Sequence, residues 1–492
     1  MAEFFMGFSE YFQRQQQMGR GDAIALIDEQ CSLSYQELTQ AITDRVTWFS
    51  QWPQEQHFFA LSFNADIWSV VTYLACLEAK IPLLLLDPQA VSELVTPQLS
   101  RLGVCVWIKN QQVQLVLANQ KPLCRKDLAL LLSTSGSTGG AKSVMLSREN
   151  LVSNARSISQ YLPMGEQDCG IASLPLSYSY GLSLLNSHLM VGARFVLTGQ
   201  SLMTKDFWKL MREHKVSSLA GVPFSYQMLK TLRLERMDLP ALKVLTQAGG
   251  RLNIELAQHF YQLAQQSGRQ FFMMYGQTEA TARIAYLPPQ YLPEYGDCIG
   301  IAIPHGELYL RDLLTNERFE EINQPGELYY QGPNVMLGYA HGANDLNSAT
   351  CITELATGDI AERLANGLFR ITGRKSRFIK LQGKRLSLDE IEANLNQAGM
   401  RECIACGRDD TLVIAFLASS SRESIQAYCV KTYGLHPTQF KLLACPVFPR
   451  LSNGKPDYQR LLVSAQAGMT ALPAIADLPL MAKQDAEQGT EQ

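Results

Sequence analysis

Leu128-Ala-Leu-Leu-Leu-Ser-Thr-Ser-Gly-Ser-Thr-Gly-Gly-Ala-Lys142 is a short apolar run that breaks abruptly into hydroxyl and glycine residues and closes on a lysine. The apolar part has the length of a buried strand, and the rest has the composition of a loop that wraps a polyphosphate. Glycine lets backbone N–H groups approach an anion, serine and threonine add donors, and Lys142 adds a positive charge. A nucleotide-binding loop after a strand is therefore predicted.

Two alternatives to this interpretation differ in strength. A P-loop has glycine directly before its lysine, but the residue here is Ala141, so that motif is excluded. A flexible surface linker is also rich in glycine and serine, although the apolar run in front of the loop argues against it. The loop resembles that of the AMP-forming acyl-adenylate synthetases, [ST]-[SG]-G-[ST]-T-G-x-P-K, with Ala141 in place of the usual proline.

Length and composition limit the possible classes. A chain of 492 residues is too long for one ordinary core, so two or more domains are expected. The net charge of −3 provides no basic face for nucleic acid. The N-terminus carries acid where a signal peptide has basic residues, and no apolar run approaches the ~20 residues that span a bilayer. We expect a cytoplasmic protein with no membrane span.

The cysteines favour buried thiols. Eleven are scattered through the chain, which is typical of reduced cysteines and not of a disulfide scaffold. Cys403 and Cys406 form one C-x-x-C, yet no second pair lies at zinc-ligand spacing. We interpret this pair as part of a buried strand, with a metal or redox site as the alternative.

The order of expected elements indicates an α/β fold. Residues 59–63 and 83–86 are strand-like and flank an expected helix at 67–79, the pattern of a parallel βαβ unit. Before them, Ser34 and Glu37 predict a capping box for a helix that ends near Phe49. From Gly296 the short alternating runs predict a small β subdomain.

A second motif, Tyr275-Gly276-Gln277-Thr278-Glu279, follows an expected strand and matches the family's [YF]-G-x-T-E. The aromatic ring can stack on adenine, the Thr278 hydroxyl can donate to the phosphate that becomes AMP, and the Glu279 carboxylate can hold Mg²⁺. By itself the pentapeptide could be a capped helix start. Its pairing with the loop before Lys142 favours the site.

Further motifs follow in the family's order. Thr357-Gly358-Asp359 matches T-G-D, the basic stretch from Gly373 to Leu386 matches the segment that closes the large domain, and Pro449 to Lys455 resembles P-x-x-x-x-G-K. Singly these are a common turn, a solvated basic face and a surface lysine. Together the resemblance covers roughly residues 20 to 465.

The resemblance implies a domain organisation. It comprises a large N-terminal adenylate-forming domain at 1–374, built of layered α/β subdomains plus a β subdomain, and a hinge at 375–376. A small mobile α+β domain at 377–468 carries the catalytic lysine. The composition of residues 469–492 predicts a disordered tail.

The resemblance also implies the site residues. Lys455, Thr278 and Glu279 would be catalytic, with Glu279 as the metal ligand. The residues implied to bind ATP or AMP are Thr134, Ser135, Gly136, Ser137, Thr138, Gly139, Lys142, Gly249, Tyr275, Gly276, Asp359 and Arg374. The implied acyl pocket consists of Tyr178, Ser179, Gly249 and Gly250. Ser376 would be the hinge, where Asp or Lys is usual, and Gly383 would lie at the thiol channel.

Ser179 bears on the substrate class. Amino-acid-activating members carry an aspartate at this position, which pairs with the α-ammonium group. A neutral hydroxyl does not offset the several kcal/mol needed to desolvate a free ammonium. The predicted substrate is a fatty or aryl acid in an apolar pocket, with no charge evident to pair with a second polar group.

The predicted activity is ATP- and Mg²⁺-dependent formation of acyl-AMP, followed by transfer to a thiol of coenzyme A or of a carrier-protein phosphopantetheine. Nothing after Lys455 is long enough to fold as a carrier domain, so a carrier would be a separate chain. A luciferase-like oxygenase would share every motif. A nucleotide-binding pseudoenzyme is suggested weakly by Ala141 and Ser376.

Overall fold

The chain forms two compact units. In the computed structural model the first comprises Met1–Thr357 with Ala361–Ile371, and the second comprises Gly358–Ile360 with Thr372–Gln492. The domain boundary predicted from the sequence lies at 375–376, a few residues after this division. The structure describes residues 8–90, 92–116, 121–133, 142–350, 352–381, 384–400, 402–408, 411–417, 421–450 and 456–472.

A seven-stranded sheet of order β19-β8-β7-β4-β3-β5-β6 forms the centre of the first unit. Strands β5, β3, β4 and β7 run parallel, whereas β6, β8 and β19 are antiparallel to their neighbours. The bounds are β3 Phe59–Ser62, β4 Leu83–Leu86, β5 Val106–Lys109, β6 Gln112–Val116, β7 Leu128–Ser133, β8 Ser143–Ser147 and β19 Gly338–Ala340. The predicted parallel unit at 59–86 is confirmed.

Local capping fixes the helices around this sheet. Helix α2 (Tyr35–Phe49) begins with the predicted capping box of Ser34 and Glu37. Helix α3 (Ile67–Glu78) is capped by Asp66, and α5 (Arg148–Tyr161) by Ser147. The unit also contains α1 (Phe8–Gln17), α4 (Ser92–Leu102) and α6 (Ser179–Met190).

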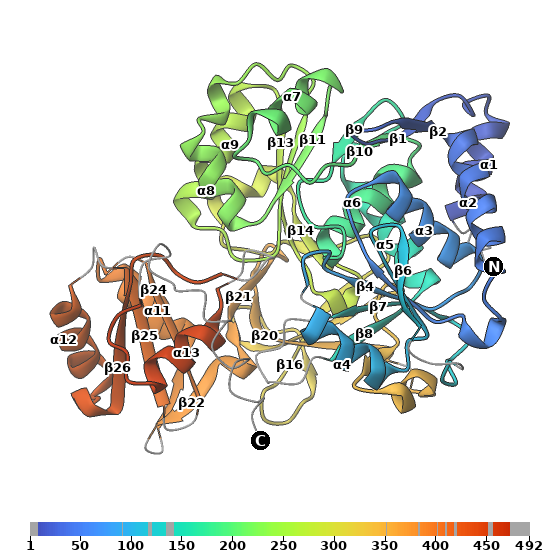
Figure 1. The fold of residues 1–492 in the computed structure, drawn as a ribbon. Coiled ribbons are helices and arrows are strands. Elements are labelled where there is room, and N and C mark those ends of the chain that lie inside the picture. The colour runs from blue at the N-terminus through green and yellow to red at the C-terminus, as the bar shows by residue number, and fades with distance from the viewer. Residues whose placement is uncertain are drawn as a thin grey trace, which may run out of the picture. The chain divides into compact units, whose positions relative to one another are not determined.

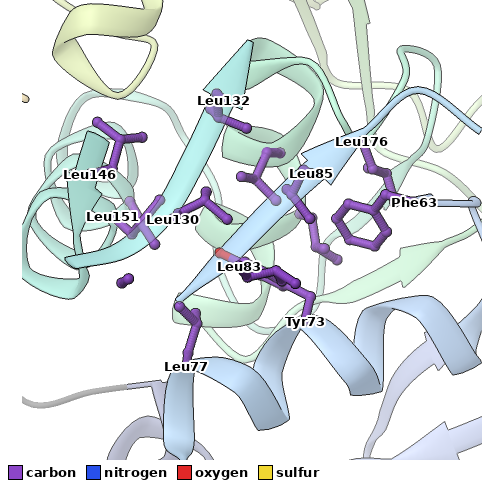
Figure 2. Packing of buried hydrophobic residues seen from close by; sticks show 14 of the residues in the cluster. Phe63, Tyr73, Leu77, Leu83, Leu85, Leu130, Leu132, Leu146, Leu151 and Leu176 are labelled. Atoms are coloured by element: carbon purple, nitrogen blue, oxygen red, sulfur yellow. The ribbon is translucent and has the colours of Figure 1, made fainter. Parts of the chain in front are cut away.

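The core between sheet and helices is built of aliphatic and aromatic side chains. Strands β4 and β7 present alternate leucines to it because successive side chains of a strand point to opposite faces. Figure 2 shows part of this core, with side chains from β4, β7 and α3 packed together: Leu83, Leu85, Leu130, Leu132, Tyr73 and Leu77. These residues are all buried, which makes the strand before Lys142 a rigid support for the residues that follow it.

A second sheet, β11-β12-β13-β14-β15, has three parallel strands and two antiparallel ones. Its strands are β11 (Ser218–Gly221), β12 (Val244–Gln247), β13 (Gln270–Tyr275), β14 (Ala285–Leu287) and β15 (Ile301–Ala302). Figure 1 shows helices α7 (Lys205–Glu213), α8 (Pro223–Thr231) and α9 (Ile254–Gln266) gathered around it, followed in the chain by α10 (Leu292–Tyr295). The carboxyl ends of β12 and β13 carry Gly249 and the Tyr275 motif.

Two further sheets, of four and five strands, contain the remaining strands of this part of the chain. One has the order β2-β1-β10-β9, with β1 Ile24–Ile27, β2 Ser32–Ser34, β9 Cys169–Ile171 and β10 Arg194–Val196. The other has the order β17-β16-β18-β20-β21, with β16 Glu307–Arg311, β17 Arg318–Phe319, β18 Gly326–Gln331, β20 Leu355–Arg363 and β21 Phe369–Arg374. The β-rich segment expected after Gly296 is confirmed, and the chain passes between the two units within β20 and β21.

The second unit contains a hairpin and a three-stranded sheet. The hairpin pairs β22 (Phe378–Leu381) with β23 (Lys384–Ser387), and the sheet has the order β24-β25-β26. The remaining bounds are β24 Cys403–Arg408, β25 Thr411–Leu417, β26 Phe440–Cys445, α11 Leu388–Gln397, α12 Arg422–Tyr433 and α13 Tyr458–Gln466. Cys403 and Cys406 lie on β24, so the interpretation of C-x-x-C as a strand is confirmed.

Within the ranges described, no group of three or more His, Cys, Asp or Glu side chains could hold a metal ion. Of the described helices, none combines the length and apolar character required to cross a bilayer. The cysteines of the described ranges are free thiols, and most of them are buried.

Candidate active site

Lys142 is the described end of the predicted phosphate loop, and it lies against an aromatic ring. Its Nζ is 3.7 Å from the centroid of the Tyr339 ring. The two residues meet because β19 pairs antiparallel with β8, with Tyr339 opposite Val144. A lysine over an aromatic face is attracted by the ring's electrons, so Tyr339 helps to orient the cation.

Tyr339 also contacts the predicted metal ligand. Its hydroxyl donates a hydrogen bond of 2.8 Å to Oε1 of Glu279. Burial and the neighbouring negative charge of Glu279 raise the pKa of Tyr339, so the phenol remains a donor at neutral pH. Lys142, Tyr339 and Glu279, hereafter the phosphate-side cluster, thus bring together a cation and a carboxylate that are far apart in the sequence.

Thr278 lies beside the predicted acyl pocket. Its Oγ1 is 3.1 Å from Oγ of Ser179, the first residue of α6. Thr278 and Glu279 are consecutive in the short 3₁₀ helix η3 (Thr278–Ala280). The structure therefore joins Ser179 to Thr278, and Thr278 to the phosphate-side cluster, within the first unit.

Hydrogen bonds and close packing constrain the backbone of the Tyr275 motif. Nε2 of Gln277 donates to the Thr357 carbonyl oxygen at 2.8 Å and to the Tyr275 hydroxyl at 3.2 Å. A Cβ atom on Gly276 would lie only 1.7 Å from the carbonyl oxygen of Ala282, so only glycine fits. These contacts fix the end of β13 where the ring of Tyr275 emerges.

Gly249 and Tyr178 face each other at the predicted acyl pocket. Gly249 has a φ of +82°, and a Cβ there would lie 2.9 Å from the Tyr178 hydroxyl oxygen. Burial raises the pKa of Tyr178 to about 12, so its hydroxyl is neutral. A Cβ on Gly250 would approach Pro223 to 3.2 Å. The predicted pocket residues Tyr178 and Gly249 are in direct proximity.

The second unit contains the predicted ribose ligands. Nε of Arg374 lies 2.5 Å from Oδ1 of Asp359, whose side chain is 2% exposed, whereas that of Arg374 is 49% exposed. The buried carboxylate thus accepts a charge-assisted hydrogen bond from a half-exposed guanidinium. Nearby in this unit Arg377 makes ion pairs with Asp389 at 3.0 Å and Glu392 at 2.6 Å.

Several predicted residues lie outside the described residues: Thr134, Ser135, Gly136, Ser137, Thr138, Gly139, Gly383 and Lys455. Ser376 lies in the 3₁₀ helix η6 (Lys375–Arg377), and its backbone alone is described. Their roles remain predictions.

Sequence reasoning missed two residues. Tyr339 was given no role from the sequence. Arg283 is 1% exposed and its Cζ is 4.0 Å from the centroid of the Tyr180 ring, next to the stretch that was expected to carry no charge. The signal for Arg283 was present, because it is the one charge in the run Ala280-Thr-Ala-Arg-Ile-Ala-Tyr286.

Comparison with known proteins agrees with this geometry. A family model described as "AMP-binding enzyme" matches residues 108–340. A long-chain-fatty-acid–CoA ligase of Yersinia pestis is 29% identical over 272 residues, which are 54% of this chain and 47% of that protein. Vanchrobactin synthetase VabF of Vibrio anguillarum is 24% identical over 72% of this chain and 14% of its own length. The chain therefore spans about half or less of these relatives.

Solved structures agree in fold. O-succinylbenzoate coenzyme A synthetase (MenE) from Bacillus subtilis, in complex with AMP, superposes with a TM-score of 0.74 at 22% identity and covers 92% of this chain and 97% of that one. The predicted α/β fold class is confirmed. The family match over residues 108–340, the relatives and the fold thus make this chain similar to the AMP-forming acyl-adenylate synthetases.

Proposed function

We propose that this protein is an ATP- and Mg²⁺-dependent ligase that converts a carboxylic acid to acyl-AMP and then transfers the acyl group to a thiol. In the first step a carboxylate oxygen attacks the α-phosphorus of ATP, a C–O–P link forms, and the bond to pyrophosphate breaks. Both reactants are anions, so the protein's task is alignment and charge neutralisation.

The phosphate-side cluster is the observation that carries this proposal. Lys142 and Glu279 lie on the two sides of Tyr339, with Nζ 3.7 Å from the ring centroid and Oε1 2.8 Å from the hydroxyl. A cation for phosphate oxygens and a carboxylate for a metal ion at one site are what a nucleotide polyphosphate with its counter-ion requires.

The donor set fits Mg²⁺. This ion takes few protein carboxylates and keeps water and phosphate oxygens as its other ligands, so the absence of a multi-carboxylate cluster in the described ranges is compatible with it. Glu279 is half-buried and bonds Tyr339 through Oε1. We assign Glu279 to the ion, which when bound would neutralise phosphate charge.

The other residues have roles that follow from their positions. Tyr275 would stack on adenine, and the Thr278 hydroxyl would donate to the α-phosphate next to Ser179, which lies 3.1 Å from it. Gly249, which has no side chain, lets the Tyr178 hydroxyl approach its backbone at the proposed acyl pocket. In the second unit, Asp359 would accept from ribose hydroxyls while Arg374 holds its carboxylate.

The acid is proposed to lack an α-ammonium group, because Ser179 and Thr278 are neutral hydroxyls and neither would offset the burial of a cation. The acceptor is proposed to be coenzyme A or the phosphopantetheine of a separate carrier protein. Coenzyme A is the acceptor that appears in the names of the fatty-acid and O-succinylbenzoate ligases described above.

ATP–pyrophosphate exchange with a panel of fatty, aryl and amino acids tests the proposal. Exchange that depends on a subset of acids would support adenylation, whereas ATP binding without exchange would favour a pseudoenzyme of the same fold. Oxygen consumption or light emission would instead reveal a luciferase-like oxygenase.

A lysine variant divides the two half reactions. Lys455→Ala is expected to lose acyl-AMP formation by about 10²- to 10³-fold, as typical for one lost charge contact, and to retain thioester formation from supplied acyl-AMP. Lys431→Ala is the matched control, since Lys431 is an exposed lysine of α12 in the same unit. Equal loss of both half reactions would contradict the assigned role.

A further inference from the structure

Arg283 is a buried cation that none of the assigned roles uses. It lies between η3 and β14, and its side chain is 1% exposed. Nε, Nη1 and Nη2 are all buried without a well-aligned hydrogen bond among the described residues, and the polar side chain of Tyr161 interacts with Arg283. Arginine remains charged in proteins, so the cost of desolvating this group cannot be avoided by deprotonation.

Two other shielded arginines among the described residues are paired. Arg377 contacts two carboxylates, and Arg45 donates to Thr72 Oγ1 at 2.6 Å while its Cζ lies 4.1 Å from the Trp68 ring centroid. In the described part of the chain, Arg283 is the arginine whose three side-chain nitrogens are all buried without a well-aligned hydrogen bond. The fold therefore holds a buried positive charge whose described neighbours are the Tyr180 ring and the Tyr161 side chain, and no carboxylate of the described residues pairs with it.

The surroundings of Arg283 connect it to the acyl pocket. Its Cζ is 4.0 Å from the ring centroid of Tyr180, the residue that follows Ser179 in α6. Successive side chains of a helix point about 100° apart. The Tyr180 side chain, with Arg283 against it, therefore points in a different direction from the Ser179 side chain, whose hydroxyl contacts Thr278. Burial raises the pKa of Tyr178 and of Tyr161, and the positive charge of Arg283 partly opposes this rise in both residues.

The backbone holds Arg283 in place. Its carbonyl oxygen accepts hydrogen bonds from Nδ2 of Asn154 at 3.2 Å and of Asn334 at 2.8 Å. The two residues before it have positive φ, +55° at Thr281 and +98° at Ala282. Side chains with a Cβ rarely adopt such angles, so the strained segment is maintained by these contacts.

We infer that Arg283 is the specificity residue for a second anionic group on the acid, and that the substrate class is a dicarboxylic acid or another carboxylic acid with a separate negative charge. This inference rests on the proposed function. The reacting carboxylate would lie at Ser179 and Thr278, and the second anion would reach the guanidinium on the Tyr180 side. A bidentate carboxylate supplies the acceptors that Arg283 lacks.

Acids matched in chain length test the inference on the wild-type protein. Each pair consists of a monocarboxylate and the acid with a terminal second carboxylate, in aliphatic and aryl series. We expect the wild type to favour the dicarboxylate of one pair by about 100-fold or more in ATP–pyrophosphate exchange, because a site built for a polar group rejects the analogue without it. The same acid should raise the thermal midpoint of the wild type.

Two variants then separate recognition from folding. Arg283→Met is expected to lose the preference and the acid-induced thermal shift, and to unfold without acid at the wild-type temperature or above, since it removes an unpaired charge. Arg283→Lys should retain part of the preference. Wild-type preference for monocarboxylates in every pair would overturn the inference and leave the proposed function standing. Exchange with no acid at all would overturn both.

Discussion

The substitution Tyr339→Phe tests the hydrogen bond between Tyr339 and Glu279 separately from the contact between Tyr339 and Lys142. The change deletes one oxygen and its 2.8 Å hydrogen bond to Glu279 but keeps the ring whose centroid lies 3.7 Å from Lys142 Nζ. A hydrogen bond to a charged group contributes about 1.5 to 3 kcal/mol, or about 10- to 150-fold in rate. Glu279 is half-buried, so water replaces part of the lost donor, and we expect a loss of about 10-fold.

The assay is ATP–pyrophosphate exchange over a range of Mg²⁺ concentrations. Because Glu279 is the proposed metal ligand, the loss should be larger at limiting Mg²⁺ than at saturation. Tyr309→Phe is a matched control, since Tyr309 donates a hydrogen bond to Glu354 elsewhere in the first unit, and its exchange should equal that of the wild type. If Tyr339→Phe and the wild type exchange equally at every Mg²⁺ concentration, the cluster does not position Glu279.

Two further predictions concern stability. Gly276→Ala should destabilise the protein by roughly 1 to 3 kcal/mol in chemical denaturation, because its Cβ meets the Ala282 carbonyl oxygen at 1.7 Å, whereas Gly199→Ala, with open space around the added carbon, should be near neutral. His188 is buried with Nε2 2.8 Å from the Ser218 hydroxyl, and burial lowers its pKa below 6.5. The folded state therefore binds fewer protons, and stability should fall as pH drops below about 6.5, less steeply in His188→Gln; parallel pH profiles for both proteins would contradict this.

The elements that sequence predicted well are those with local causes. The capping box of Ser34 and Glu37 joins residues three apart, so it could be read before any tertiary contact was known. The helix expected at 67–79 is α3, Ile67–Glu78. The strand expected at 59–63 ends one residue earlier, at Ser62, because the end of a strand depends on which neighbours pair with it.

Parts of the site were also predictable from motifs alone. Thr278 and Glu279 are adjacent in sequence, and Asp359 and Arg374 lie on the consecutive strands β20 and β21, so each pair was expected at one place. The residues that bind these motifs together were not predicted. Neither Tyr339 nor Arg283 belongs to a motif whose chemistry marks it.

Sequence by itself determined the α/β class, the order of motifs and the residue types suited to a nucleotide. Only the tertiary structure decided that Tyr339 reaches Lys142 and Glu279, because that contact requires the antiparallel register of β19 against β8, nearly two hundred residues away in the chain. It also decided that the single charge at 283 is buried beside Tyr180. Burial and cross-strand register are properties of packed surfaces, so a residue's identity does not reveal them until its distant neighbours are in place.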